Sequence, residues 1–367
     1  MLTAAGSVVT RQIDRSIRYH SLVDPVHTQQ NTGISEFRME GLLRGDIRLS
    51  DALRTTLAFG YSERDEEHRL QPESTLRQFD IDSLRRIEER KNNLSRRTTV
   101  SASAAAAVSS SDTLELAGSG SILRYDTPSQ DNTDDRDELW YVASLTTHHH
   151  PSRVLALHFT VDLSMTHLVY LFSQMSANNT WNRILRFAPK IDYAPLPQFR
   201  TENSFEVLAN YTVYDFDYIA SQTHSYVFRQ FAFIDSSTID LTHKLSLDAY
   251  TFLRFYERGE LRWNDFAERP VDYFEDRTYI GTLRYAISHR LLFSLGIRYF
   301  SQMRYGFEGT DHVLVGSFRS LGPMGGIVLG VGSRSDLSLK GWYERQTQTG
   351  QPARGTTTLT MLLNVRI

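Results

Sequence analysis

The stretch from Arg277 to Phe300 alternates between two kinds of residue with a period of two. Its first half places Tyr279, Gly281, Leu283, Tyr285 and Ile287 on alternate positions, and its second half places Leu291, Phe293, Leu295, Ile297 and Tyr299. The polar residues Ser288-His289-Arg290 separate the halves. Successive side chains of a β-strand point to opposite faces, so this pattern predicts two strands joined by a short turn.

The two faces of these strands differ in polarity. One is apolar and ends in aromatic residues, while the other carries Thr282, Arg284, Ser294, Gly296 and Arg298. Each strand has about the ten residues that a tilted strand needs to cross a bilayer. An apolar face toward lipid and a polar face toward water are typical of a transmembrane barrel. The stretch therefore predicts an all-β fold, a transmembrane antiparallel up-and-down β-barrel.

The same unit repeats along the whole chain of 367 residues. We expect about 16 strands, within a range of 14–18, in a single domain over 1–367 with an N-terminal tail at 1–6. Short turns, expected near Ser50, Ser109, His149, Pro195, Thr242, Ser288 and Ser333, alternate with longer polar connections. This alternation predicts short periplasmic turns, long extracellular loops at 62–94 and 257–276, and both termini on the periplasmic side.

Three segments leave alternatives open. The even strand count requires the Gly-rich segment 322–326 to be part of one crossing rather than a turn. Residues 226–241 are strand-like, but their phase slips and their faces stay unassigned. In the connection 62–94, Leu76, Phe79, Leu84 and Ile87 have loosely helical spacing, although the segment could instead extend the neighbouring strands.

Composition excludes several classes of protein. The formal net charge is −3, so no overall polycation suggests nucleic-acid binding. The absence of cysteine excludes a disulfide scaffold, a thiol nucleophile and a thiolate metal site, and suits a protein that crosses an oxidising periplasm. No secretory signal is visible in 1–6, so we expect the numbering to begin after, or inside, the true precursor.

The basic residues are almost all arginine, because only Lys91, Lys190, Lys244 and Lys340 are lysines among 40 basic residues. Arginine keeps its charge and pairs in a planar fork, which suits a crowded and partly desolvated wall. Alternation predicts that a set of charged residues lines an aqueous lumen: Arg38, Glu40, Arg44, Asp46, Arg48, Asp248, Arg254, Arg284, Arg298, Lys340 and Arg366.

The last strand has apolar residues at alternate positions up to the final residue, namely Leu359, Met361, Leu363, Val365 and Ile367. This pattern resembles the C-terminal signature of bacterial outer-membrane β-barrel proteins, a porin-like class, and identifies no individual family. In that class the last residue is usually aromatic, whereas here it is Ile367. The resemblance implies an outer-membrane location, contact with outer-membrane lipids, and help from the barrel-assembly machinery during biogenesis.

Signals for chemistry are weak. His148-His149-His150 could bind a metal, but adjacent side chains of an extended chain diverge, and a solvated turn is the better interpretation. No G-x-S-x-G or H-E-x-x-H motif is present, although His158 or His167 could pair with a serine on a neighbouring strand. We therefore expect no enzyme activity, no cofactor and no metal.

The functional hypothesis is a porin-like outer-membrane channel for passive diffusion of small hydrophilic solutes through an arginine-rich lumen. The alternative is a barrel that serves as scaffold or outer component of an export, adhesion or electron-transfer assembly, with a periplasmic or surface protein partner. An embedded hydrolase is a third, weaker interpretation.

Overall fold

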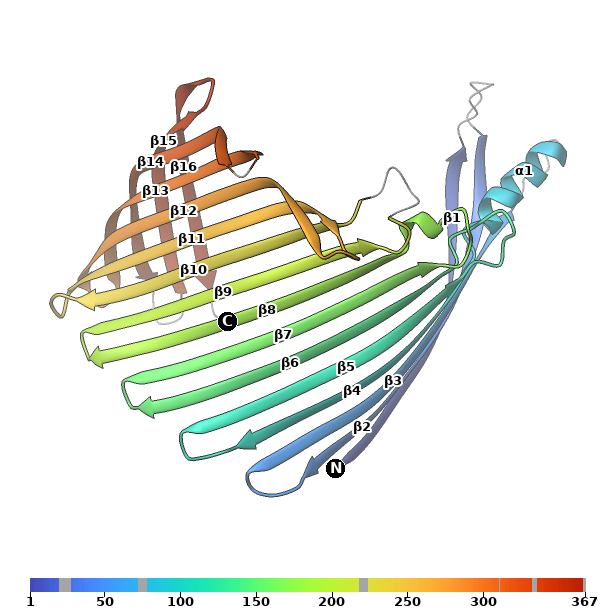
Figure 1. Ribbon diagram of the computed structural model, residues 1–367, viewed down its shortest axis with the longest axis horizontal. Coiled ribbons are helices and arrows are strands. Elements are labelled where there is room, and N and C mark those ends of the chain that lie inside the picture. The colour runs from blue at the N-terminus through green and yellow to red at the C-terminus, as the bar shows by residue number, and fades with distance from the viewer. Residues whose placement is uncertain (20–27, 72–77, 218–223, 310, 332–334, 366–367) are drawn as a thin grey trace.

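A computed structural model describes residues 1–19, 28–71, 78–217, 224–309, 311–331 and 335–365. Sixteen strands, β1 to β16, form one antiparallel sheet in which every strand pairs with its neighbours in sequence (Figure 1). The predicted all-β, up-and-down architecture is confirmed. Among the described residues, no helix is long and apolar enough to span a membrane.

The strands are 14 to 22 residues long, so each exceeds the minimum for one crossing. Their bounds are β1 Leu2–Tyr19, β2 Thr28–Arg48, β3 Leu53–Gln71, β4 Asn93–Ala107, β5 Asp112–Asp126, β6 Arg136–Ser152, β7 Leu155–Tyr170, β8 Thr180–Leu196, β9 Phe199–Tyr214, β10 Tyr226–Asp240, β11 Leu245–Arg262, β12 Ala267–Ser288, β13 Leu291–Glu308, β14 Asp311–Val331, β15 Ser335–Gln348 and β16 Gln351–Val365. Helix α1, Gln78–Glu89, and a 3-10 turn at Ser176–Asn178 lie in two of the longer connections.

Strand register separates the side chains onto two faces, as the period of two predicts. Leu247 pairs with Leu283, and Leu283 pairs with Leu295, which together form a row on what we call the apolar face. Leu295 is 58% exposed there, because only lipid would cover it. The alternate positions form the opposite side, which we call the charged face, where Asp248 pairs with Thr282 and Thr282 with Gly296.

Several predicted boundaries change. Residues 2–6 belong to β1 rather than to a tail, since Leu2 to Gly6 pair with residues 41–45 of β2. The expected loops at 62–94 and 257–276 are shorter, because β3, β11 and β12 continue beyond the ten residues of a minimal crossing. Cross-strand ion pairs hold these extensions together, so polar sequence there does not imply a loop. The helical spacing in 62–94 does correspond to α1.

Two open questions about strands are settled. The segment 322–326 lies within β14, so it is part of a single crossing and the count of 16 strands holds. In β10, Phe231 and Phe233 lie on the apolar face opposite Val207 and Phe205, whereas Ala232 and Ile234 lie on the charged face. The phase slips in the sequence because apolar residues occupy both faces of this strand.

The sheet curves strongly, and its first and last strands lie on opposite sides of it (Figure 1). Within the described residues, β1 pairs only with β2, and β16 pairs only with β15. The backbone N–H and C=O groups on the outer edges of β1 and β16 consequently have no strand beside them in the described part of the chain. Within the described residues, β1 begins and β16 ends at the end of the sheet that carries the short turns, as expected for an even strand number.

Candidate functional site

The charged face is the candidate site, because it gathers the predicted lumen residues. Register places ten of them on this face: Arg38, Glu40, Arg44, Asp46, Arg48, Asp248, Arg254, Arg284, Arg298 and Lys340. Arg366 lies outside the described residues. The structure thus brings these ten side chains to one side of the sheet, although their role in lining a lumen stays a prediction.

Most of these charges have a partner that the sequence did not identify. Arg44 binds Asp46 on the same strand at 3.0 Å, and Asp46 also accepts a hydrogen bond from Thr56 of β3 at 2.7 Å. Arg38 binds Glu36 at 3.0 Å. Arg48 binds Asp51 of the short turn at 2.7 Å. On β2, like-signed neighbours are therefore separated by opposite charges, which prevents mutual repulsion.

Pairs between strands dominate farther along the sheet. Arg284 of β12 donates to Asp248 of β11 at 2.7 Å. Arg186 of β8 donates to Asp162 of β7 at 2.8 Å and to Glu206 of β9 at 2.7 Å, so it links three strands. These guanidinium groups are 38–40% exposed. Such half-exposed pairs contribute modestly to stability, and they leave a hydrated polar surface of low net charge.

Arg298 reaches across an intervening strand to its partner. It pairs with Gly322 of β14 in the strand register, yet its guanidinium donates to Glu344 of β15 at 2.7 Å. The missing side chain at Gly322 leaves the path between them open. A Cβ atom at position 322 would lie 1.7 Å from the backbone oxygen of Tyr343. This contact between β14 and β15 therefore requires glycine.

Aromatic rings and arginines alternate on the charged face of β11 to β13. Tyr256 stacks on Phe274 with ring centroids 4.7 Å apart. The guanidinium carbon of Arg254 lies 4.9 Å from the centre of the Tyr256 ring, and that of Arg304 lies 5.6 Å from the centre of the Phe274 ring. Stacked guanidinium groups lose little freedom when they bind a further planar or anionic group.

Two buried carboxylates hold the arginines of this cluster. Asp272 is 5% exposed and pairs with Arg258 and Arg304, the latter at 2.8 Å. Asp276 is 2% exposed and pairs with Arg254, and it also accepts a hydrogen bond from Gln302 at 2.9 Å. Burying a carboxylate is unfavourable unless it is paired, so each aspartate depends on its arginines.

Asp272→Asn is expected to lower the free energy of unfolding by about 1–3 kcal/mol, less than the full effect of breaking a buried pair because both arginines are half exposed. Urea unfolding from lipid vesicles measures the change. Asp51→Asn is the matched control, because the side chain of Asp51 is 98% exposed and its loss should leave stability unchanged. Equal stability of the two variants would show that Asp272 does not anchor Arg258 and Arg304.

A cavity of about 620 Å³ opens on the same face between β6 and β11. Its basic lining residues are His148, His158, Arg186, Lys190 and Arg254, and its acidic one is Glu206. Lys190 is itself paired with Glu202 at 3.0 Å, and Glu206 accepts a hydrogen bond from Gln230 at 2.8 Å. The cavity offers many donors and acceptors without a large excess of one charge, and its volume suits a small hydrophilic molecule.

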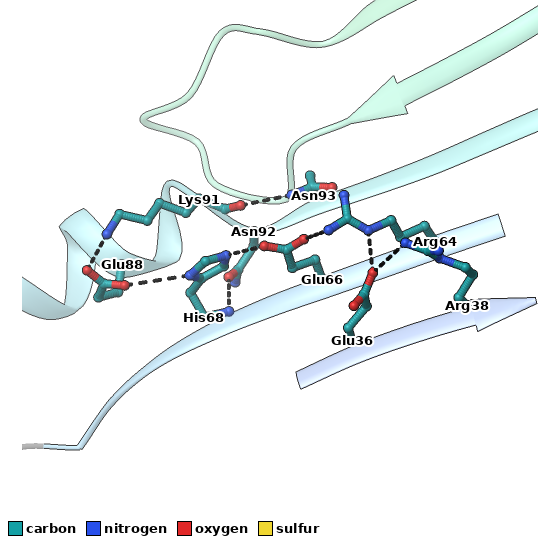
Figure 2. Close-up of polar contacts among 9 residues, drawn as sticks. All are labelled: Glu36, Arg38, Arg64, Glu66, His68, Glu88, Lys91, Asn92 and Asn93. Carbon is teal, nitrogen blue, oxygen red and sulfur yellow. Dashed lines mark hydrogen bonds and ion pairs between the residues drawn. The ribbon is translucent and has the colours of Figure 1, made fainter. Parts of the chain in front are cut away.

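Helix α1 docks onto the charged face through a relay of charges (Figure 2). The side chain of Glu88, at the end of α1, is buried and lies 3.7 Å from His68 of β3. His68 contacts Glu66 at 2.7 Å, Glu66 pairs with Arg64, and Arg64 binds Glu36 of β2 at 2.6 Å. Helix α1 is thereby tied to the wall.

The three consecutive histidines lie in β6 and not in a turn, which corrects the sequence interpretation. The strand continues to Ser152, and the turn follows at 153–154. His148 lies on the charged face with its ring centroid 4.7 Å from that of His158, while His149 points the other way and contacts Asp112. Within the described residues, no group of three His, Cys, Asp or Glu side chains has the arrangement of a metal site.

The two histidines that could have paired with serine contact carboxylates instead. His158 lies 3.4 Å from Asp192, and His167 lies 2.9 Å from Asp215. His167 also stacks on Trp181, with centroids 4.1 Å apart. These partners orient the imidazole rings without supplying a nucleophile.

Sequence reasoning missed the aromatic part of the charged face. The sequence pattern was used to place aromatic residues only at the ends of the apolar face, whereas pairs such as Phe255-Tyr256 and Tyr273-Phe274 put one ring on each face. Adjacent side chains of a strand point in opposite directions, so only Phe255 and Tyr273 lie on the apolar face. The sequence does contain this information, because Tyr256 and Arg254 are two residues apart and therefore lie on the same face of the strand.

No protein-family model matches this sequence, and no curated protein matches it. Solved structures do. The alcaligin outer-membrane receptor FauA from Bordetella pertussis matches with a TM-score of 0.51 and 11% identity, over 100% of this chain and 64% of FauA. The siderophore receptor PirA from Acinetobacter baumannii matches with a TM-score of 0.49 and 10% identity, over 99% of this chain and 58% of PirA.

The fold is that of a bacterial outer-membrane β-barrel protein. The class predicted from the last strand is thereby confirmed, and the match supports the predicted outer-membrane location. At 11% identity the likeness concerns the fold. The chain spans somewhat less than two thirds of the receptor that it matches.

Proposed function

We propose that this chain forms the wall of an outer-membrane transport barrel and that its charged face lines a passage for small hydrophilic solutes, which cross by passive diffusion. The observation that carries the proposal is the separation of the two faces. Leu283 and Leu295 on the apolar face suit lipid, while Arg284 and Asp248 on the charged face suit water. A dry protein core would disfavour the charged face, and a sheet with water on both sides would disfavour the apolar face.

The ion pairs would set the selectivity of such a passage. Arg186, Arg284 and Arg298 each have a carboxylate partner on another strand, so the wall presents alternating positive and negative groups rather than a field of one sign. Hydrated solutes would exchange water for these donors and acceptors at low cost. Weak preference between anions and cations is the expected consequence.

A passage in lipid also requires that the edges of β1 and β16 be paired. Each backbone group left without a partner in hydrocarbon costs several kcal/mol, so an open edge cannot persist within the bilayer. The two strands run antiparallel to each other in an up-and-down sheet of 16 strands, which is the arrangement that closure of the barrel needs.

Conductance across planar bilayers tests the proposal. Discrete single-channel steps are expected from the purified chain, with current proportional to voltage near zero. The Arg298→Gln variant should alter the reversal potential in a salt gradient, because it leaves Glu344 without its cation. A tight seal without steps, obtained with protein shown to be inserted, would contradict a passive channel.

A second candidate is uptake of a bound ligand, as the name of the alcaligin receptor FauA implies for that protein. The aromatic and arginine cluster around Tyr256, Arg254 and Phe274 favours it, because stacked rings and guanidinium groups suit specific recognition. Tracer uptake into vesicles separates the two. Passive diffusion gives flux that rises linearly with solute concentration, whereas a binding step gives saturation.

We propose transport rather than catalysis, since the histidines of the wall pair with Asp192 and Asp215 and not with serine.

A further inference from the structure

The apolar face has a groove on β13 to β15. An evenly packed layer of lipid-facing side chains would leave no such groove. Its volume is about 680 Å³, and its apolar lining includes Leu295, Ile297, Leu321 and Pro323. Gly296 and Gly322 line it as well. Leu295, Ile297 and Leu321 are about half exposed, so the groove is open to the surrounding medium.

Two arginines, Arg319 of β14 and Arg345 of β15, lie at the long-loop end of this groove and line it. Arg319 pairs with Thr347 and Leu321 pairs with Arg345, so the two arginines are diagonal neighbours on the apolar face. Diagonal neighbours have Cα atoms roughly 7–8 Å apart. Both side chains are exposed, and no ion pair of theirs occurs within the described parts of the chain.

The contrast with the nearby Arg277 is informative. Arg277 lies on the same face and pairs with Glu275 at 2.6 Å. Two adjacent guanidinium groups without a carboxylate repel each other, and an anion between them would remove that repulsion. The fork geometry of arginine suits the oxygens of a phosphate group.

The level of the arginines on the wall fits a lipid headgroup. Tyr299, which is half-buried, lines the groove, and the exposed Tyr343 lies on the same face two residues before Arg345. Tyrosine, with an apolar ring and a polar hydroxyl, suits a lipid–water boundary. Arg319 lies about 40 Å along β14 from the short-turn end at Val331, or about 28 Å along the membrane normal at a tilt of about 45°. The lipid-facing band of a barrel is about 25 Å tall, so Arg319 lies just above it. Arg345 pairs with Leu321, two positions nearer the short turn, and lies about 23 Å along the membrane normal, at the upper edge of the band.

We propose that this groove binds one membrane lipid with a phosphate-bearing headgroup, its acyl chain along Leu295, Ile297 and Leu321 and its phosphate between Arg319 and Arg345. This lipid site is distinct from the solute passage of the proposed function, because it lies on the opposite face of the sheet. The lipid-site proposal shares with the proposed function only the placement of the apolar face in a bilayer.

Native mass spectrometry of the full chain in detergent, titrated with dioleoylphosphatidylglycerol, tests the site. One bound lipid per chain is expected at saturation. Arg319→Gln with Arg345→Gln should weaken binding about 25-fold, from roughly fivefold per arginine. Arg153→Gln with Arg290→Gln removes the same charge from two short turns and should leave the affinity unchanged.

The nature of the ligand is tested by competition. Dihexanoylphosphatidylglycerol should bind more weakly than the dioleoyl lipid, because its chains fill less of the groove, and inorganic phosphate should not displace the lipid at equal concentration. Displacement by inorganic phosphate, unchanged affinity in the Arg319 and Arg345 variant, or a stable dimer of the chain that excludes lipid would each overturn the proposal. The conductance of that variant should equal that of the wild type, so failure of the passage and failure of the lipid site are distinguishable.

Discussion

Gly322→Ala is expected to be among the most damaging single changes in this chain, lowering the free energy of unfolding by about 3 kcal/mol, the upper end of the range for overpacking. A Cβ atom there would lie 1.7 Å from the backbone oxygen of Tyr343 and 3.0 Å from the Cα atom of Glu344. Backbone atoms cannot rotate away as a side chain can, so β14 and β15 must separate. The separation would also break the ion pair between Arg298 and Glu344.

Gly316→Ala is the matched control for this change. Gly316 lies on the same strand and the same face, and a Cβ atom there would have no heavy atom within 4 Å. Its replacement should be tolerated. Folding titrations into lipid vesicles measure both variants, and Förster transfer between labels on β14 and β15 reports the separation. Equal stability of the two variants would show that the close approach at Gly322 is not required.

Leu295→Arg should make the free energy of folding into lipid about 2–4 kcal/mol less favourable, the range for arginine on the lipid face near mid-membrane. Leu295 is 58% exposed on the apolar face. It lies about 13 Å along β13 from the short-turn end, or about 9 Å along the membrane normal at a tilt of about 45°, inside the apolar band of about 25 Å. No carboxylate is within reach on the neighbouring positions, Leu283 and Gly325, to pair with the new charge.

Arg298→Leu provides the comparison on the opposite face of the same strand. The side chain of Glu344 is 11% exposed and would lose its cation. A cost of about 1–2 kcal/mol in the free energy of unfolding is expected, together with altered ion selectivity. A larger cost at Arg298 than at Leu295 would mean that the faces are assigned the wrong way round.

The period of two was sufficient to predict the strands and their faces. Each crossing places residues such as Leu283 and Arg284 on opposite sides, and a shift of one residue would expose every arginine of that strand to lipid. Register is therefore strongly determined by sequence, which is why the count of 16 strands and the shared face of Arg38, Arg254 and Arg298 followed from alternation alone.

Partners between strands could not be predicted in the same way. Whether Arg298 reaches Glu344 depends on the relative stagger of β13 and β15 and on the missing side chain at Gly322 between them. The predicted loop boundaries were wrong for a related reason. Residues such as Arg64, Glu66 and His68 are as polar as a loop, but their pairing with Glu36 and Glu88 keeps them in a strand beyond the apolar band.

The pairing of every strand with its sequence neighbours has a consequence for how such a wall can change in size. All strand pairings within the described residues are between sequence neighbours, so the hairpin behaves as a unit that carries its own apolar face and its own ion pairs, as β11 and β12 do with Asp248 and Arg284. Duplicating or deleting one hairpin would keep the alternation of short turns and longer loops, and would return the chain to the same side of the membrane. The circumference of the wall can therefore grow or shrink in steps of two strands, with each step changing the passage while leaving the remaining pairs in register.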